Sequence, residues 1–289
     1  MHIPVMLNEV LKGLDIISNG IYFDCTFGTG GHSFVVSKFL NRHASLKMID
    51  KDLSNFFIFG KKFFFIKKKF FFYKCAFDEI SDIIYDNNLF GKVNGILVDF
   101  GISNYQLLDF NRGFGFKTDG FLDMRLDLNQ NIRAVDWFNF ASLDELVIVF
   151  SFIDNLKLSK AIVSEILFFR KKNKIRTSDD FYKILFKVCS SSKNYMNYFN
   201  KIYQAVRIFI NNDMSVLFSF LRNIFDSLSS SGVLLFISFN SLEDKIIKNF
   251  FKNNSLVLKS FVNFIKPSIE ELNNNYSSRS AIMRFFIKK

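Results

Sequence analysis

The stretch IYFDCTFGTGGHS, residues 21–33, reads as a short apolar strand that runs directly into a glycine-rich turn. Glycine lacks a Cβ, so Gly28, Gly30 and Gly31 can adopt positive φ and let a ligand approach the main chain. Asp50 ends the next apolar run about 20 residues later, where a carboxylate can accept hydrogen bonds from ribose hydroxyls. The spacing therefore predicts a nucleotide-like ligand at the end of the first strand.

The glycine pattern differs from the dinucleotide fingerprint at its third position. That position carries Ser33 instead of glycine. A pyrophosphate requires close packing and strong donors there, whereas a cofactor without phosphate, such as S-adenosylmethionine, requires only room for its amino-acid end and an acid for its ribose. For this stretch alone, a plain tight turn is the alternative interpretation.

Composition indicates a globular protein with a polyanionic partner. The 289 residues are 49% hydrophobic and include 38 basic and 27 acidic side chains, which gives a formal charge of +11. This length fits one large domain or one domain with an insertion, and the charge favours nucleic acid as the partner. It disfavours a small metabolite as the substrate but does not separate RNA from DNA.

Cysteine and histidine usage indicates a reducing compartment and no metal site. Cys25, Cys75 and Cys189 show no C-x-x-C spacing, and the histidines form no ligand cluster with them. The first residues lack a basic segment followed by an apolar one, and no run approaches about 18 apolar residues. We therefore expect a cytoplasmic protein without a membrane-spanning helix.

Phenylalanine is unusually frequent, with 41 residues, and it alternates with lysine between Phe56 and Lys74. Such a segment could be a stacking platform for single-stranded nucleic acid or an interfacial membrane helix. Because Phe, Lys, Asn and Ile are raised along the whole chain, general compositional drift is the simpler interpretation.

Apolar runs alternate with helical patterns in two separate parts of the chain. The runs GILVDF, residues 95–100, and GVLLFISF, residues 232–239, do not alternate polar and apolar residues, so both faces of each strand should be covered. This arrangement predicts an α/β fold with a mostly parallel sheet. Strands are expected at residues 21–25, 46–49, 70–73, 95–100 and 233–239, and helices at 32–40, 78–85, 214–227 and 245–251.

Between Phe100 and Met214 helical patterns replace the strands, at residues 142–152, 159–170 and 179–188. Thr177 and Asp180 have capping-box spacing, and Ser241 and Asp244 repeat it before the last expected helix. A helical insertion in an α/β domain is the simplest account. We expect the first part of the main domain at residues 1–112, the inserted helical substrate-recognition domain at 113–206 and the second part at 207–289.

Asp99 ends the strand GILVDF. Ligands of open α/β sheets bind beyond the carboxyl ends of such strands, so Asp99 should share one rim with Asp24 and Asp50. An N-cap for the next helix is the alternative for Asp99 alone. The flexible and polar residues that follow, including Gly101 and Ser103, favour a ligand site because they have no core to join.

The segment RGFGFKTDGFLDMRLD, residues 112–127, combines glycine, charge and aromatic residues without helical or strand periodicity. An exposed charged turn is the alternative. A solvated turn seldom needs Phe114, Phe116, Leu122 and Met124 as well, so an ordered functional loop is favoured.

Seven segments occur in the order seen in the MraW family, the bacterial ribosomal RNA small subunit methyltransferases H, which this chain resembles over residues 2–284. They are HIPVMLNEVL, DCTFGTGGHS, VDFGISNYQL, RGFGFKTDGFLDMRLD, YQAVRIFINNDM, ISFNSLEDKIIKNFF and SSRSAIMR. The resemblance implies a class I S-adenosylmethionine-dependent methyltransferase domain, Rossmann-like, with an inserted helical domain. It also implies methylation of N4 of a cytidine in the decoding centre of 16S rRNA, within the small ribosomal subunit.

The resemblance further implies a set of cofactor-binding residues, namely Gly30, Gly31, His32, Asp50, Phe77, Asp99 and Gln106. Phe77 offers a flat apolar face for adenine, and Asp99 can hold an ammonium or an adenine amine by a charge-assisted hydrogen bond. A buried core phenylalanine is the alternative for Phe77.

An amine delocalised into a ring needs positioning, hydrogen-bond acceptors and a proton sink. The candidates to surround the base are Asp99, Asp123, Ser238 and Asn240. Guanidinium groups bind phosphate bidentately, and the base must be unpaired or flipped out to react. The candidates for RNA contact are Arg112, Arg125, Arg207 and Arg279.

Four positions depart from the family pattern, and the first is Asn104 where serine is usual. Tyr105 and Phe121 stand where proline is usual, and Asn240 stands where histidine is usual. An amide can orient a base but does not titrate, so Asn240 cannot replace a proton acceptor. Two alternatives therefore stay open: a non-catalytic ribosome-assembly factor that retains the fold, and a methyltransferase for another substrate.

Overall fold

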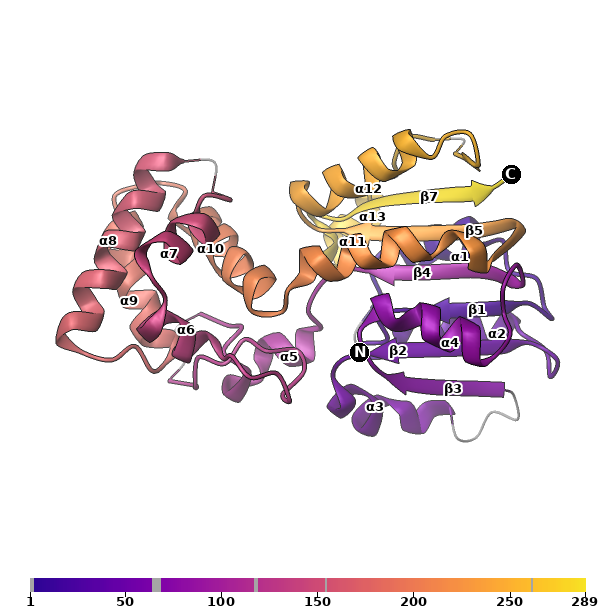
Figure 1. Ribbon diagram of the computed structural model, residues 1–289, viewed down its shortest axis with the longest axis horizontal. Helices are drawn as coiled ribbons and strands as arrows, with labels where there is room; N and C mark the ends of the chain where they lie inside the picture. Colours follow the sequence, from indigo (N-terminus) through magenta and orange to yellow (C-terminus); the bar gives the residue numbers. More distant parts are fainter. Residues whose placement is uncertain (1–2, 64–68, 117–118, 154, 261) are drawn as a thin grey trace. The chain divides into compact units, whose positions relative to one another are not determined.

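The computed structural model describes residues 3–63, 69–116, 119–153, 155–260 and 262–289, which form two compact units (Figure 1). The first unit contains the chain up to Ile102 and from Met214 onward, and the second contains Ser103–Asp213. Both predicted domain boundaries, after residues 112 and 206, fall inside the second unit. A role of the second unit in substrate recognition stays a prediction.

The first unit is built on a seven-stranded sheet with the order β3-β2-β1-β4-β5-β7-β6. The five parallel strands are the five expected from the sequence, and β7 is antiparallel to both of its neighbours, β5 and β6. The bounds of the seven strands are β1 Ile21–Asp24, β2 Ser45–Asp50, β3 Lys69–Lys74, β4 Val93–Asp99, β5 Leu228–Ser238, β6 Leu258–Lys259 and β7 Ile282–Lys288. The predicted α/β class is confirmed, and this strand order is that of class I methyltransferases.

Helices cover both faces of this sheet. On one face, apolar residues of α4, α11 and α12 pack on Ile96, Val98, Leu234 and Phe236 of the central strands. On the other face, α1 and α2 pack on Tyr22, Leu97 and Leu235. The helices are α1 Leu7–Leu14, α2 Gly31–Phe39, α3 Leu53–Phe59, α4 Ile80–Asp86, α11 Asp213–Asn223, α12 Ser241–Asn253 and α13 Ile269–Asn274. Continuous apolar runs such as GILVDF are therefore required, because each central strand is buried on two sides.

Short 3₁₀ turns join several of these elements. They are η1 Gly60–Phe63, η2 Phe77–Glu79, η4 Phe225–Ser227 and η5 Tyr276–Ser278. Within the phenylalanine and lysine segment, Phe56 stacks on Phe72 with ring centroids 4.2 Å apart, and Phe63 is buried. Its residues 64–68 lie outside the described residues. The described rings thus contribute to packing of the first unit, although Phe57 remains exposed.

The second unit is helical, as the sequence predicts for this part of the chain. Its helices are α5 Asn104–Leu108, η3 Phe110–Arg112, α6 Ala134–Phe140, α7 Leu143–Phe150, α8 Leu156–Lys172, α9 Ser178–Cys189 and α10 Tyr195–Ile210. Phe138 and Phe181 are fully buried, with ring centroids 4.4 Å apart. The predicted capping box is present, since the Thr177 hydroxyl accepts from Asp180 N at 3.1 Å and the Asp180 carboxylate accepts from Thr177 N at 3.1 Å.

Two absences apply to the residues that the structure describes. In this part of the chain no helix combines the length and apolarity that crossing a bilayer requires. The same residues hold no group of three or more His, Cys, Asp or Glu side chains placed to bind a metal ion.

Candidate cofactor and substrate site

The carboxyl ends of four neighbouring parallel strands form one rim of the first unit. β2, β1, β4 and β5 end at Asp50, Asp24, Asp99 and Ser238. Because parallel strands end on the same edge of a sheet, these four side chains start from a common line. The rim expected from the sequence is therefore present.

Asp50 is fixed by three donors of its own unit. Its Oδ2 accepts from Gly28 N at 2.7 Å and from Asn55 Nδ2 at 3.1 Å, and its Oδ1 accepts from Asp52 N at 2.8 Å. Burial raises the pKa of this carboxyl to about 6, and the three hydrogen bonds only partly oppose the effect. Each oxygen has two lone-pair sites, so Oδ1 retains capacity for a further donor such as a ribose hydroxyl.

Two positions of the glycine turn leave no room for a side chain. Gly30 has φ +70°, and a Cβ there would lie 2.7 Å from the Phe27 ring. A Cβ on Gly31 would lie 2.5 Å from Pro4 Cγ, because the HIPVML segment packs against the turn. Both glycines are thus required by backbone conformation and by close packing at the start of α2.

His32 connects this turn to the end of β4. It is 6% exposed, and its Nε2 donates to the carbonyl oxygen of Val5 at 2.9 Å. Burial lowers the His32 pKa, so the ring is neutral and carries its hydrogen on Nε2. Its Nδ1 lies 3.7 Å from Asp99 Oδ2.

Asp99 carries a carboxylate oxygen to which no described residue donates a hydrogen bond. Burial raises the Asp99 pKa well above its usual range, and the charges of Asp24 and Glu243 add to the effect. Among the described residues, nothing donates a hydrogen bond to the buried Oδ1. A buried acceptor without a partner costs about 1–3 kcal/mol. Asp99 therefore suits a ligand that brings a donor, and a cation above all.

Phe77 lies in η2, immediately after β3. Its ring meets Phe100 and Phe220 edge to face, with centroids 5.8 and 5.4 Å apart. It is only half-buried, so it is a core-packing residue that still reaches the surface of the first unit. Contact with adenine stays a prediction.

Ser238 and Asn240 follow β5. Ser238 is buried, and its hydroxyl donates to the carbonyl oxygen of Ile282 at 3.3 Å. The sequence predicted Ser241 as the helix cap, and this is wrong by one residue, since Asn240 is the cap of α12. Asn240 Oδ1 accepts from Leu242 N at 3.0 Å and from Glu243 N at 2.8 Å, while its buried Nδ2 has no partner among the described residues.

Asp244, the fourth residue of that predicted box, has another function. Its carboxylate binds the Arg284 guanidinium through two hydrogen bonds, of 2.6 and 2.9 Å. This pair links two of the segments that carry the family resemblance, ISFNSLEDKIIKNFF and SSRSAIMR. The two segments therefore contact each other through α12 and β7.

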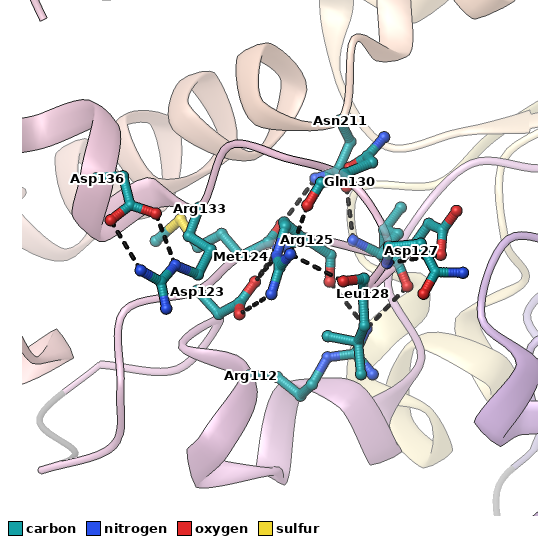
Figure 2. Close-up of polar contacts among 12 residues, drawn as sticks. Arg112, Asp123, Met124, Arg125, Asp127, Leu128, Gln130, Arg133, Asp136 and Asn211 are labelled. Atoms are coloured by element: carbon teal, nitrogen blue, oxygen red, sulfur yellow. Dashed lines mark hydrogen bonds and ion pairs between the residues drawn. The ribbon is translucent and has the colours of Figure 1, made fainter.

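The loop that contains Asp123 and Arg125 belongs to the second unit and is closed by internal hydrogen bonds (Figure 2). Arg125 Nε and Nη2 donate to the two carboxylate oxygens of Asp123 at 2.7 and 2.8 Å. Arg125 Nη1 also donates to the carbonyl oxygens of Leu128 and Gln130. Residues 117–118 of the expected functional loop lie outside the described residues.

The side chains of Arg112 and Asn211 also hold the same loop by hydrogen bonds. The Arg112 Nη2 atom donates to the carbonyl oxygens of Arg125 and Leu126, at 2.8 and 3.0 Å. Asn211, from the YQAVRIFINNDM segment, donates to Met124 O at 2.8 Å and accepts from Leu126 N at 2.6 Å (Figure 2). These bonds join YQAVRIFINNDM to RGFGFKTDGFLDMRLD, a second pair of the segments that carry the family resemblance.

The remaining predicted residues differ in exposure. Gln106 is buried and forms the capping box of α5 with Ser103, through bonds of 3.0 and 3.2 Å. Arg207 is buried, with its Nε 3.4 Å from Asp213 Oδ2. Arg279 is exposed, lies over the Tyr276 ring at 4.2 Å, and has no carboxylate partner among the described residues.

The structure thus divides the predicted residues between the two units. The first unit brings together residues of the glycine turn and of the strand ends. These are Gly30, Gly31, His32, Asp50, Phe77, Asp99, Ser238 and Asn240, and the first unit also carries Arg279. The second unit holds Gln106, Arg112, Asp123, Arg125 and Arg207, whose roles toward a ligand or RNA stay predictions.

Sequence reasoning missed two residues of this rim. Asn55 is 1% exposed, donates to Asp50, and has a carbonyl oxygen without a partner among the described residues. Glu243 is buried and accepts from Phe239 N at 3.1 Å, which fixes the turn after β5. One signal would have found both residues. It is an acid or amide that is buried in the first turns of a helix that follows a rim strand.

The strand order, the glycine turn and the row of rim acids are those expected of an S-adenosylmethionine-dependent methyltransferase, and the family match agrees. The chain belongs to the MraW methylase family, whose model matches residues 1–289.

Individual relatives align over nearly the whole chain. A ribosomal RNA small subunit methyltransferase H of Wigglesworthia glossinidia brevipalpis is 37% identical over 306 residues, covering 99% of this chain and 98% of that protein. One of Ureaplasma urealyticum is 34% identical over the same length, with the same coverage of both chains. A solved rRNA methylase of Streptococcus thermophilus aligns over 100% of this chain and 99% of its own at 7% identity, with a TM-score of 0.45.

Proposed function

We propose that this protein transfers a methyl group from S-adenosylmethionine to N4 of a cytidine in the decoding centre of 16S rRNA. The family and the names of the relatives support rRNA of the small subunit as the substrate. The observation that carries the chemistry is the buried Oδ1 of Asp99 at the end of β4, which lacks a hydrogen-bond partner among the residues that the structure describes. Without a ligand at this position, nothing would offset the free-energy cost of burying the Asp99 oxygen.

Residues of the first unit would hold the cofactor by complementary groups. Asp50 would accept from the ribose hydroxyls, Phe77 would cover the adenine, and Asp99 would accept from the ammonium of the methionine end. Gly30 and Gly31 have no side chains, so the main chain at this part of the turn could be approached by that end. When bound, S-adenosylmethionine supplies a methyl group on a positively charged sulfur.

The reaction then requires little acid–base chemistry from the protein. The amine nitrogen bonds to the methyl carbon as the carbon–sulfur bond breaks, and the amine loses one proton to water. Positioning of two bound reactants contributes up to roughly 7–11 kcal/mol to such a step. Asn240 cannot accept the proton, since its Oδ1 already binds two main-chain N–H groups and an amide does not titrate.

RNA contact is assigned to the exposed Arg279, whose guanidinium is available for a phosphate, and to the net positive charge of the chain. The guanidinium groups of Arg112, Arg125 and Arg207 are engaged by acceptors of the second unit, so we assign them to shaping that unit. A site of action on ribosomal RNA agrees with the expected cytoplasmic location.

One experiment tests the reaction and its position. Small ribosomal subunits from cells that lack this gene are incubated with purified protein and labelled S-adenosylmethionine, and the rRNA is digested and analysed by mass spectrometry. We expect one methyl group on N4 of a decoding-centre cytidine. Label on another base would refute the position, and binding of the cofactor without any label would favour a non-catalytic assembly factor.

A further inference from the structure

Two buried polar atoms at the ends of adjacent strands have no hydrogen-bond partner in the described parts of the chain. Asp99 Oδ1, after β4, is an acceptor, and Asn240 Nδ2, after β5, is a donor. The two loops touch, because a Cβ on Gly101 would lie 3.4 Å from the Phe239 ring. The carboxylate is already assigned to the cofactor, but the amide nitrogen has no assigned function.

The orientation of the Asn240 amide is fixed by α12. Its Oδ1 accepts from two main-chain N–H groups, so the amide cannot flip without losing both bonds. Only Nδ2 remains for a ligand, and an NH₂ group can pair only with an acceptor. Asn240 therefore requires an acceptor atom from whatever occupies this end of the rim.

The strand order places Asn240 on the substrate side of the site. The residues assigned to the cofactor follow β1, β2, β3 and β4, whereas Asn240 follows β5. β4 lies between β1 and β5, so Asp99 separates Asn240 from the ribose and adenine positions. The amine of the target base would lie near Asp99, where it meets the methyl group. The atom next to that amine on the same edge of the base would then lie near Asn240.

We infer that Asn240 Nδ2 donates a hydrogen bond to ring atom N3 of the target cytidine and thereby positions the neighbouring N4 amine. N3 is the acceptor directly next to that amine on the base edge, which matches a single donor placed beside the methyl position. This inference rests on the proposed function. It makes Asn240 a base-positioning residue rather than a proton acceptor.

Two variants remove the amide NH₂ group while they retain an oxygen for the helix cap. Asn240→Asp and Asn240→Ser both keep an oxygen that can accept from Leu242 N and Glu243 N, and Asp and Ser are favoured caps. We expect kcat/KM for the rRNA to fall by about 10- to 100-fold in both, with an unchanged unfolding midpoint. Asn249→Asp, at an exposed position of the same helix, is the matched control and should keep full activity.

A substrate lacking N3 tests the contact itself. Decoding-centre RNA with 3-deazacytidine at the target position replaces the ring acceptor by C–H. For this substrate we expect the wild-type protein to slow by a similar factor and Asn240→Ser to slow no further. If the variant and the modified base each reduced the rate independently, so that the two factors multiplied, the inference would be overturned. The free-energy effects of groups that share no contact add.

Calorimetry with S-adenosylmethionine separates the remaining outcomes. Unchanged cofactor affinity in Asn240→Ser supports a contact with the base. A loss of cofactor affinity as large as the loss of activity would overturn it, since the amide would then serve the cofactor's carboxylate. Full activity of both variants would overturn it too, whereas a wild-type protein that methylates no rRNA would refute the proposed function instead.

Discussion

Asp99 and Asp123 both lie in segments that carry the family resemblance, but the hydrogen-bond partners of their carboxylates differ. Asp99, at the rim of the first unit, has a buried oxygen without a partner among the described residues, and burial raises its pKa. Asp123, in the loop of the second unit, has both oxygens bound by Arg125. The comparison shows that a motif residue can serve a ligand or the fold, and its hydrogen-bond partners distinguish the two.

The largest effect is expected at Asp99. Asp99→Ala should reduce methyl transfer by at least about 1,000-fold, because it removes the acceptor for the charged end of the cofactor. The raised pKa means that this carboxyl opposes folding at neutral pH, so the unfolding midpoint should not fall. Radiolabel transfer and thermal unfolding measure the two effects. Retained activity would refute the site.

Arg125 should show the reverse behaviour, with a loss of stability. Asp123 and Arg125 side chains are only 8% and 15% exposed, so Arg125→Ala leaves a buried charge unpaired and should cost about 3–5 kcal/mol. The control is Arg133→Ala, whose pair with Asp136 is 40% and 36% exposed and should contribute no more than about 1 kcal/mol. Urea unfolding of both variants measures the difference, and equal losses would contradict the assignment.

Asp50 makes cofactor binding depend on pH. Its pKa of about 6 without ligand means that the carboxyl is protonated in acid, whereas ribose hydroxyls favour the ionised form. The dissociation constant should therefore rise by up to about tenfold per pH unit below pH 6 and stay flat above it. Calorimetry between pH 5 and pH 8, values set by this pKa, measures the profile. Asp50→Asn should bind weakly at every pH, and a pH-independent wild-type affinity would contradict the prediction.

The same pKa has a consequence for the stability of the ligand-free protein. A raised carboxyl pKa stabilises the fold below the unfolded value of 3.8, and this contribution is lost as the pH rises through about 6. Saturating cofactor should therefore raise the unfolding midpoint more at pH 7.5 than at pH 5.

The smallest effect is expected at Arg279. The exposed guanidinium contributes one phosphate contact, so Arg279→Ala should weaken RNA binding severalfold and reduce the salt slope of log K by about 0.7–0.9. Folding and cofactor affinity should not change. Filter binding at several salt concentrations measures the slope, and an unchanged slope would show that the residue does not contact phosphate.

The sheet of the first unit was largely predictable because its strands are locally distinctive. Continuous apolar runs predicted β4 and β5, and the glycine turn fixed the end of β1. β7 was missed because Arg284 interrupts an otherwise strand-like sequence. Its charge is tolerated in an interior strand because Asp244 and the carbonyl oxygen of Asn263 bind it, and no local pattern shows partners 21 and 40 residues away.

The candidate site was predictable in its residue types but not in its hydrogen bonds. The glycine turn and the aspartates after the strands were recognisable from spacing. The capping role of Asn240 and the closure of the loop by Arg112 depend on which main-chain groups lie nearby, and tertiary structure alone decides that. The sequence therefore could not separate Arg112 from the exposed Arg279.

The position of β7 has a consequence for synthesis of the protein. β5 leaves the ribosome more than 40 residues before β7, yet β7 is its partner on one side. Until Ile282–Lys288 emerge, the nascent chain presents an apolar strand with an open edge, which is a template for pairing with other chains. Protection of that edge by a chaperone, or rapid completion of translation, would then decide how much of the protein reaches its native state.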